Sequence, residues 1–120
     1  MKLLNIQIEF AHDVGLLLLY VFKQGYSCTL GEAWRPLITA QFYAKEHKGI
    51  TDSLHCNRLA IDLNLFDENG NYISDGSDKR YKDLGDYWES LDSDNKWGGY
   101  FIERGGHIND PDHFERRMPL

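Results

Sequence analysis

An alternating run of residues is the feature that most constrains how this chain can fold. Four large aliphatic side chains alternate with a second set that includes one carboxylate: Leu59, Ile61, Leu63 and Leu65 against Ala60, Asp62, Asn64 and Phe66. Because successive side chains of a strand point to opposite faces, this period of two predicts a strand with one face in the core. The Asn69-Gly70 pair that follows predicts a tight turn, after which Tyr72 and Ile73 pair back as a hairpin.

Helical patterns come before this strand, and shorter strands come after it. The first predicted helix runs from Ile6 to about Gln24 and ends at Gly25. Its apolar run, residues 14–22 (VGLLLLYVF), is too short to span a bilayer and indicates a buried core helix rather than a signal peptide. Further helices are predicted from Pro36 to near Gly49 and over 81–91, strands over 26–34 and 113–116, a loop over 50–57, and a loop entering a strand over 97–101. The expected class is α+β, a small antiparallel sheet with helices packed on it.

Length and composition narrow the function classes. The 120 residues predict a single catalytic or binding domain, residues 1–120. Thirteen Lys and Arg against nineteen Asp and Glu give a net charge of −6, which argues against a general nucleic-acid binder and against simple electrostatic adhesion to anionic surfaces. Two cysteines without a C-x-x-C motif exclude a disulfide framework and a zinc ribbon.

Side chains that bind metals gather in two segments, 53–62 (SLHCNRLAID) and 110–115 (DPDHFE). Asp62 is the polar exception in its strand, and a carboxylate there is costly unless it is paired or bound to a metal. Two histidines and one carboxylate are a common catalytic zinc set that leaves the fourth position for water. Spacing alone leaves open the alternative that His55 is an ordinary surface or hydrogen-bonded histidine.

Four motifs between about Trp34 and Glu115 carry a family resemblance: S-x-H, A-x-D, W-G-G and D-x-x-H-F-E. Together they resemble the LAS-type zinc peptidases of peptidoglycan. That family includes D-Ala-D-Ala dipeptidases, D,D-carboxypeptidases and the L-alanyl-D-glutamate endopeptidases of phage endolysins, and the short single-domain form looks most like the last group. The resemblance implies one zinc ion, held by His55, Asp62 and His113.

The resemblance also implies roles for residues around the metal. Asp110 matches the catalytic carboxylate, which takes a proton from water and passes it to the leaving amine. Arg35 would hold a developing oxyanion or a substrate carboxylate. Gln41 and Trp97 join Arg35 as candidate substrate-binding residues. For Trp97, packing in the core is the alternative. A turn position for Asp110 and a surface ion pair for Arg35 are the simpler alternatives. Arg58 stands where the family usually has glycine.

The sequence therefore predicts a zinc metallopeptidase that cleaves peptidoglycan stem peptides, at the L-Ala–D-Glu bond, as a phage endolysin. Two alternatives stay open: a D,D-carboxypeptidase or dipeptidase acting on D-Ala-D-Ala termini, and a non-catalytic zinc-binding module. The expected partners are peptidoglycan and a holin that gives access to the wall, without nucleic acid or a membrane span. A monomer is expected, in the host cytoplasm until release and then in the periplasm or cell wall.

Overall fold

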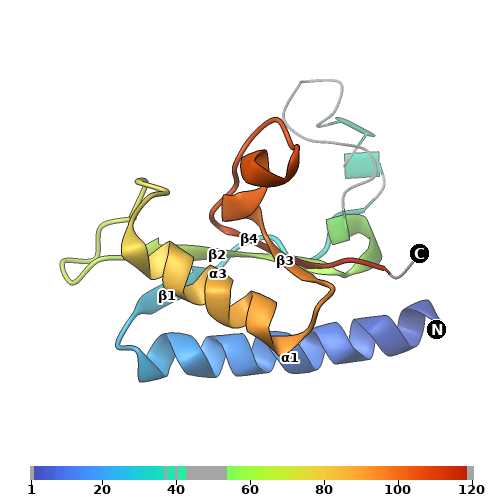
Figure 1. Ribbon diagram of the computed structural model, residues 1–120, viewed down its shortest axis with the longest axis horizontal. Helices are drawn as coiled ribbons and strands as arrows, with labels where there is room; N and C mark the ends of the chain where they lie inside the picture. Colours follow the sequence, from blue (N-terminus) through green and yellow to red (C-terminus); the bar gives the residue numbers. More distant parts are fainter. Residues whose placement is uncertain (1, 37, 40, 43–53, 119–120) are drawn as a thin grey trace.

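The chain folds around a four-stranded antiparallel sheet with the strand order β1-β2-β4-β3. The computed structural model describes residues 2–36, 38, 39, 41, 42 and 54–118. The strands are β1 (Ser27–Leu30), β2 (Ala60–Phe66), β3 (Asn95–Trp97) and β4 (His113–Arg116). Two helices, α1 (Leu3–Lys23) and α3 (Lys79–Leu91), pack against each other and against the sheet (Figure 1). The α+β class expected from the sequence is confirmed.

The core lies between this sheet and the two helices. Ile61, Leu63 and Leu65 of β2 are buried, as their alternation predicts, and they join one cluster with side chains of α1 and α3. Trp88 of α3 is fully buried, and its ring meets the rings of Phe10 and Phe114 edge to face at centroid distances of 5.6 and 6.2 Å. The opposite face of β2, which includes Asp62, is therefore left for the site.

The first predicted helix is confirmed, with a start three residues earlier than expected. α1 begins at Leu3 and ends at Lys23, and Gly25 adopts the positive φ of +75° that turns the chain toward β1. The predicted hairpin after β2 is present as a single antiparallel bridge between Phe66 and Tyr72.

The second predicted helix falls in a part of the chain that is described only in places. Residues 38, 39, 41 and 42 are helical, and the remainder of the interval to Gly49 lies outside the described residues. The predicted loop over 50–57 is wrong where it can be checked, because Leu54–Asn57 forms a short 3₁₀ helix; residues 50–53 lie outside the described part.

The order of elements around Trp97 is the reverse of the sequence prediction. Trp97 ends β3, where it pairs with Phe114 of β4, and the 3₁₀ helices Gly98–Tyr100 and Ile102–Arg104 follow it. The chain leaves the strand because the Gly98 carbonyl accepts hydrogen bonds from the amides of Phe101 and Asp110, which close the segment into a loop. This loop rises on the side of the sheet away from α1 (Figure 1).

A buried arginine ties the last strand to the first helix. The Arg116 side chain is 6% exposed and forms ion pairs with Glu9 at 2.5 Å and with Asp13 at 3.6 Å, both on α1. Asp92, after α3, lies 3.2 Å from the same guanidinium. Buried charges are tolerated when they are paired in this way, so this network fixes α1 against β4.

Candidate metal centre

The pairing of β2 with β4 brings two of the predicted metal ligands face to face. Asp62 lies directly opposite His113 in the antiparallel register, so both side chains project from the same face of the sheet. His55 comes from the 3₁₀ helix Leu54–Asn57, just before β2. Its Nε2 lies 3.2 Å from Nδ1 of His113 and 3.4 Å from Oδ1 of Asp62, and the remaining pair, His113 Nδ1 and Asp62 Oδ1, is 3.3 Å apart.

These three distances fit a single tetrahedral metal ion. Donor atoms about 2.1 Å from a tetrahedral zinc lie about 3.4 Å from one another, which is the spacing observed here. The donors are two imidazole nitrogens and one carboxylate oxygen, the set found in catalytic zinc sites with one open position. His55 and His113 are 2% and 7% exposed, so their rings are held by packing before any ion binds. The sequence prediction that these three residues come together is confirmed.

The charges in the cluster favour a cation at this position. Partial burial alone would raise the pKa of Asp62, but hydrogen bonds with His113 and His55 outweigh it and lower the pKa to about 2. Burial alone would lower the pKa of His113, but its contacts with Asp62 and Glu115 raise the pKa to about 9. The carboxylates therefore stabilise positive charge, whether it is carried by a proton or by a metal ion.

A carboxylate holds the other side of the His113 ring. Glu115 Oε1 lies 2.7 Å from His113 Nε2, and Glu115 is itself held by Arg117, whose Nε donates to Oε2 at 2.9 Å. A carboxylate can only accept, so Nε2 carries a hydrogen toward Glu115, and Nδ1 is the ring nitrogen left to bind a metal ion once it has given up its proton. This role of Glu115 was not predicted from the sequence, although residues two apart in a strand share a face and the spacing of His113 and Glu115 signals it.

A similar but looser arrangement stands behind His55. Glu32 Oε1 lies 3.9 Å from His55 Nδ1 and accepts a hydrogen bond from Arg35 Nε at 2.7 Å. The Arg35 backbone amide also donates to the His55 carbonyl at 3.2 Å. Arg35, which the sequence assigns to substrate or oxyanion binding, is therefore placed beside the cluster and paired with Glu32. Glu32 was not singled out from the sequence, which carries no local signal for it.

Asp110 reaches the site through a tight turn that depends on a glycine. Its amide donates to the Gly98 carbonyl at 2.9 Å, and its own carbonyl accepts from the His113 amide at 3.0 Å. A Cβ at position 98 would lie 2.0 Å from the Asp110 carbonyl oxygen, so only glycine allows this approach. This contact gives the W-G-G motif a physical reason, since it anchors the loop that carries Asp110.

The environment of Asp110 raises the pKa of its carboxyl. The protein around it removes part of its hydration, and the charges of Asp62 and Asp112 add to the upward shift against the opposing influence of His113. Solvent still reaches the side chain, which stands at the edge of a cavity. The position combines access to solvent with proximity to the cluster.

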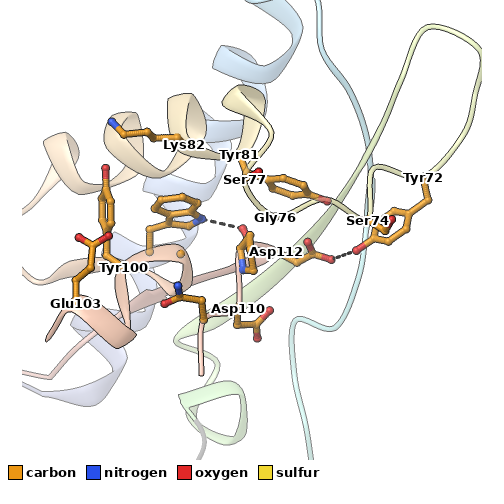
Figure 2. A pocket seen from close by; sticks show the side chains of 14 residues that line it. Tyr72, Ser74, Gly76, Ser77, Tyr81, Lys82, Tyr100, Glu103, Asp110 and Asp112 are labelled. Carbon is orange, nitrogen blue, oxygen red and sulfur yellow. Dashed lines mark hydrogen bonds between the residues drawn. The ribbon is translucent and has the colours of Figure 1, made fainter. Parts of the chain in front are cut away.

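The cavity beside Asp110 has a volume of about 670 Å³, within the range of sites for small ligands. It lies between the loop of Asp110 and the start of α3, and Tyr72, Tyr81 and Tyr100 contribute to its lining (Figure 2). Asp112 points toward Tyr72, whose hydroxyl donates to it at 2.7 Å. The wall is thus mixed, with aromatic rings, hydroxyls and carboxylates.

Two further residues assigned to substrate binding occupy different environments. Trp97 is 4% exposed and donates from Nε1 to the Pro111 carbonyl at 2.7 Å, so it packs in the core while part of its ring lines the cavity. Gln41 is exposed on the short helical segment after Pro36. Neither position tests a contact with substrate.

The backbone conformation of Arg58 explains why a glycine suits this position, three residues after His55. Among the described residues other than glycine, it alone has a positive φ, of 57°. This left-handed conformation costs an L-residue about 1–2 kcal/mol relative to glycine. The Arg58 guanidinium lies 4.6 Å from the centre of the Trp34 ring, a cation–π contact that offsets part of this cost. The chain therefore keeps the turn that places His55, although the glycine is absent.

Comparisons with known proteins support the fold through structure rather than sequence. No protein-family model matches the chain, and no curated protein matches it. Among solved structures it is similar to the crystal structure of the L-Ala D-Glu endopeptidase ChiX from Serratia marcescens, with a TM-score of 0.71 and 15% identity. The match covers 91% of this chain and 78% of that chain. The resemblance drawn from the sequence motifs is thereby confirmed for the fold. The cluster of His55, Asp62 and His113 confirms it for a site that could hold a metal ion.

Proposed function

We propose that the chain is a zinc-dependent peptidase that hydrolyses the L-Ala–D-Glu bond in the stem peptides of bacterial peptidoglycan. The observation that carries this proposal is the set of three donor atoms on His55, Asp62 and His113 at tetrahedral separations. The structural similarity to an L-Ala D-Glu endopeptidase supports the choice of bond. The cavity that Asp110 helps to line supports a substrate larger than a single amino acid.

In this proposal His55 Nε2, Asp62 Oδ1 and His113 Nδ1 would hold the zinc ion. Zinc, when bound, supplies Lewis acidity, which polarises a carbonyl group and makes water a stronger acid. Glu115 holds the His113 ring in the orientation that keeps Nδ1 in the cluster. Glu32 stands behind His55 and holds the Arg35 guanidinium, which stays our candidate for a substrate carboxylate or a developing oxyanion.

Asp110 is our candidate for the group that moves protons. Its carboxylate would accept a proton from the attacking water and then donate that proton to the nitrogen of the leaving amine. Its raised pKa supports both steps, because a base with a pKa closer to the working pH holds the proton long enough to return it. Its position on the cavity edge leaves room for the scissile bond.

The test combines metal analysis with digestion of purified peptidoglycan. We expect about one zinc per chain, and mass spectrometry of the fragments should show a new D-Glu amino terminus. Asp110→Ala should retain zinc and lose about 10²–10⁴-fold in rate. Glu68→Ala, at a carboxylate whose side chain is 82% exposed, should leave the rate unchanged and serves as the control.

Three outcomes would contradict the proposal. Release of free D-Ala without a new D-Glu terminus would make the chain a D,D-carboxypeptidase or dipeptidase. Zinc near one per chain without any hydrolysis would indicate a non-catalytic zinc-binding module. An Asp110→Ala variant that retains both zinc and full activity would remove Asp110 from the mechanism.

We further propose that this activity serves a phage as an endolysin, a monomer that waits in the host cytoplasm and reaches the wall with a holin. Expression in a bacterial host should cause lysis when a holin is produced with it. Lysis that is equally rapid without a holin would contradict this setting.

A further inference from the structure

Residues 110–112, which we call the Asp110 turn, carry the candidate proton-transfer group and lead directly into β4. Two of its three residues are held from the end of β3. The Asp110 amide donates to the Gly98 carbonyl at 2.9 Å. The Pro111 carbonyl accepts a hydrogen bond from Nε1 of Trp97 at 2.7 Å. These two contacts restrain the turn on the side of β3.

The same turn is also held from the opposite end of the cavity wall, by the segment between β2 and α3. The Tyr72 hydroxyl donates to Oδ2 of Asp112 at 2.7 Å (Figure 2). Gly76 lies against the ring of Pro111, so closely that a Cβ at position 76 would be 2.5 Å from Pro111 Cγ. We call residues 72–76 the support segment. Each residue of the Asp110 turn therefore has a contact that fixes it from outside the turn.

The support segment is itself fixed to both neighbouring elements. The Ile73 amide donates to the Leu65 carbonyl of β2 at 2.9 Å, and the Ile73 side chain is 8% exposed. The Ile73 carbonyl accepts from the Tyr81 hydroxyl of α3 at 2.8 Å. The Tyr72 ring meets the Phe66 ring edge to face at a centroid distance of 6.0 Å. The Tyr72 hydroxyl is thus presented from a backbone that the core holds in place.

From these contacts we propose that Tyr72 is a positioning residue of the peptidase, which acts through Asp112 to hold Asp110 at its place beside the metal cluster. The inference rests on the proposed function, in which Asp110 transfers the proton. The Asp112 carbonyl accepts from the Leu63 amide at 2.8 Å, which fixes the backbone where the turn enters β4. The bond to Tyr72 restrains the side chain of the same residue, so its loss lets the turn move and displaces Asp110.

A direct contact with substrate is the alternative role for Tyr72, because its side chain lines the cavity and is 48% exposed. The two roles differ in their kinetic effect. Loss of a uniform contact with substrate raises KM and leaves kcat unchanged, whereas displacement of a catalytic group lowers kcat. The hydroxyl is already bonded to Asp112, which favours the positioning role.

The experiment measures kcat and KM of the zinc-loaded chain on a soluble stem tripeptide that contains the L-Ala–D-Glu bond. Tyr72→Phe removes only the hydroxyl, and kcat should fall about tenfold or more while KM stays unchanged. Zinc affinity, measured by competition with a chelating dye, should also stay unchanged. Added to Asp112→Ala, the Tyr72→Phe substitution should lower kcat no further, because both changes remove the same contact.

The matched control is Tyr20→Phe. The Tyr20 hydroxyl donates to a carboxylate in the same way, to Asp83 of α3 at 2.6 Å, but that bond does not involve the Asp110 turn. The control should therefore leave kcat unchanged. Circular dichroism checks that each variant is folded.

Hydrogen exchange of backbone amides gives a second readout that needs no peptidase activity. Tyr72→Phe should speed exchange at the amides of Asp110 and His113, whose acceptors are the carbonyls of Gly98 and Asp110. Exchange at the Leu65 amide of β2 should stay unchanged. If the unaltered chain cleaves no stem peptide, the proposed function fails, and hydrogen exchange still shows whether Tyr72 holds the turn.

Three results would overturn the inference in a chain that cleaves the tripeptide. The first is an unchanged kcat in Tyr72→Phe. The second is a raised KM with an unchanged kcat, which would make Tyr72 a substrate-binding residue. The third is a zinc affinity that falls as much as kcat, which would place the effect at His113 rather than at Asp110.

Discussion

Glu115 Oε1 accepts a hydrogen bond from Nε2 of His113 at 2.7 Å, while the other nitrogen of the same ring faces Asp62 and His55. The carboxylate thus sets which nitrogen is available to a metal and holds the ring in place. Contacts of this kind behind a metal ligand contribute to metal affinity as well as to geometry.

Glu115→Gln should therefore weaken zinc binding about 10–100-fold. The amide keeps the shape but loses the charge that strengthens the bond from Nε2. The measurement is competition with a chelating dye, which reads affinity without any peptidase assay. As a control, Arg80→Gln removes an arginine that pairs with Asp78 rather than with any of the three ligands, and it should leave the affinity unchanged. Equal affinity of Glu115→Gln and the unaltered chain would show that Glu115 is only a packing residue.

Gly98→Ala should lower peptidase activity while zinc remains bound. The added Cβ would lie 2.0 Å from the Asp110 carbonyl oxygen, so the loop must move and carry Asp110 with it. A displacement of about 1 Å in a catalytic group can cost about 10²-fold in rate. Gly15→Ala, where a Cβ meets nothing within 4 Å, is the matched control and should not reduce the rate. Full activity in Gly98→Ala would mean that the loop position is not critical.

Arg116→Ala should lower the free energy of unfolding by about 3–5 kcal/mol, because it leaves the buried Asp13 without its cation. Urea denaturation followed by circular dichroism measures this loss. Lys82→Ala breaks an exposed pair with Asp86 and should cost no more than about 0.5 kcal/mol. A loss for Arg116→Ala as small as that control would show that the network contributes little to stability.

Replacements of Arg58 should separate backbone conformation from side-chain contact. Arg58→Gly and Arg58→Ala both remove the contact with Trp34, but only glycine adopts a φ of 57° without steric cost. Arg58→Gly should therefore be the more stable of the two by about 1 kcal/mol. Thermal unfolding of the pair measures the difference, and a more stable alanine variant would contradict the left-handed turn.

The stability of the chain should fall at alkaline pH partly through Tyr20. Its hydroxyl donates to Asp83 at 2.6 Å, and this bond, with burial, raises the pKa of Tyr20 to about 12. A group whose pKa is raised by folding stabilises the protein below the unfolded pKa, about 10, and that stabilisation is lost as pH rises toward 12. Tyr20→Phe should therefore be less stable than the unaltered chain at pH 8, and the gap should close between about pH 10 and 12.

Asp83, which accepts the hydrogen bond from Tyr20, should make the stability of the chain fall in acid. Burial alone would raise the pKa of Asp83, but hydrogen bonds from Tyr20, Tyr26 and Gln24 outweigh it and lower the pKa. The stabilisation from Asp83 is present above its unfolded pKa and is lost as pH falls through the folded value. Asp83→Asn should therefore be less stable than the unaltered chain at neutral pH, and this difference in stability should shrink in acid. A difference that stays constant with pH would contradict the link between stability and the lowered pKa of Asp83.

Local patterns were sufficient to predict the parts of the fold that depend on neighbours in the sequence. The alternation around Asp62 identified β2, and the unexplained carboxylate in it pointed to the metal cluster. The family motifs then supplied His55 and His113, which lie in the cluster as expected. These predictions succeeded because the spacing of buried side chains, and the residue types that bind metals, are both visible within short segments of the sequence.

The remaining features depend on contacts between distant segments. Arg116 and Asp13 meet across most of the chain, and no local pattern indicates that an aspartate at the edge of an apolar run is buried beside an arginine. Trp97 was placed before a strand rather than at its end, because the pairing with Phe114 decides where β3 lies.

The order in which the ligands occur along the chain has a consequence for synthesis. His55 and Asp62 leave the ribosome together, but His113 and its supporting Glu115 are translated about 50 residues later and reach the cluster only when β4 pairs with β2. A nascent or prematurely terminated chain that lacks β4 therefore has neither the third donor nor the carboxylate behind it. The three donors therefore come together only after β4 has paired with β2, so a bound metal ion would report that this pairing has formed.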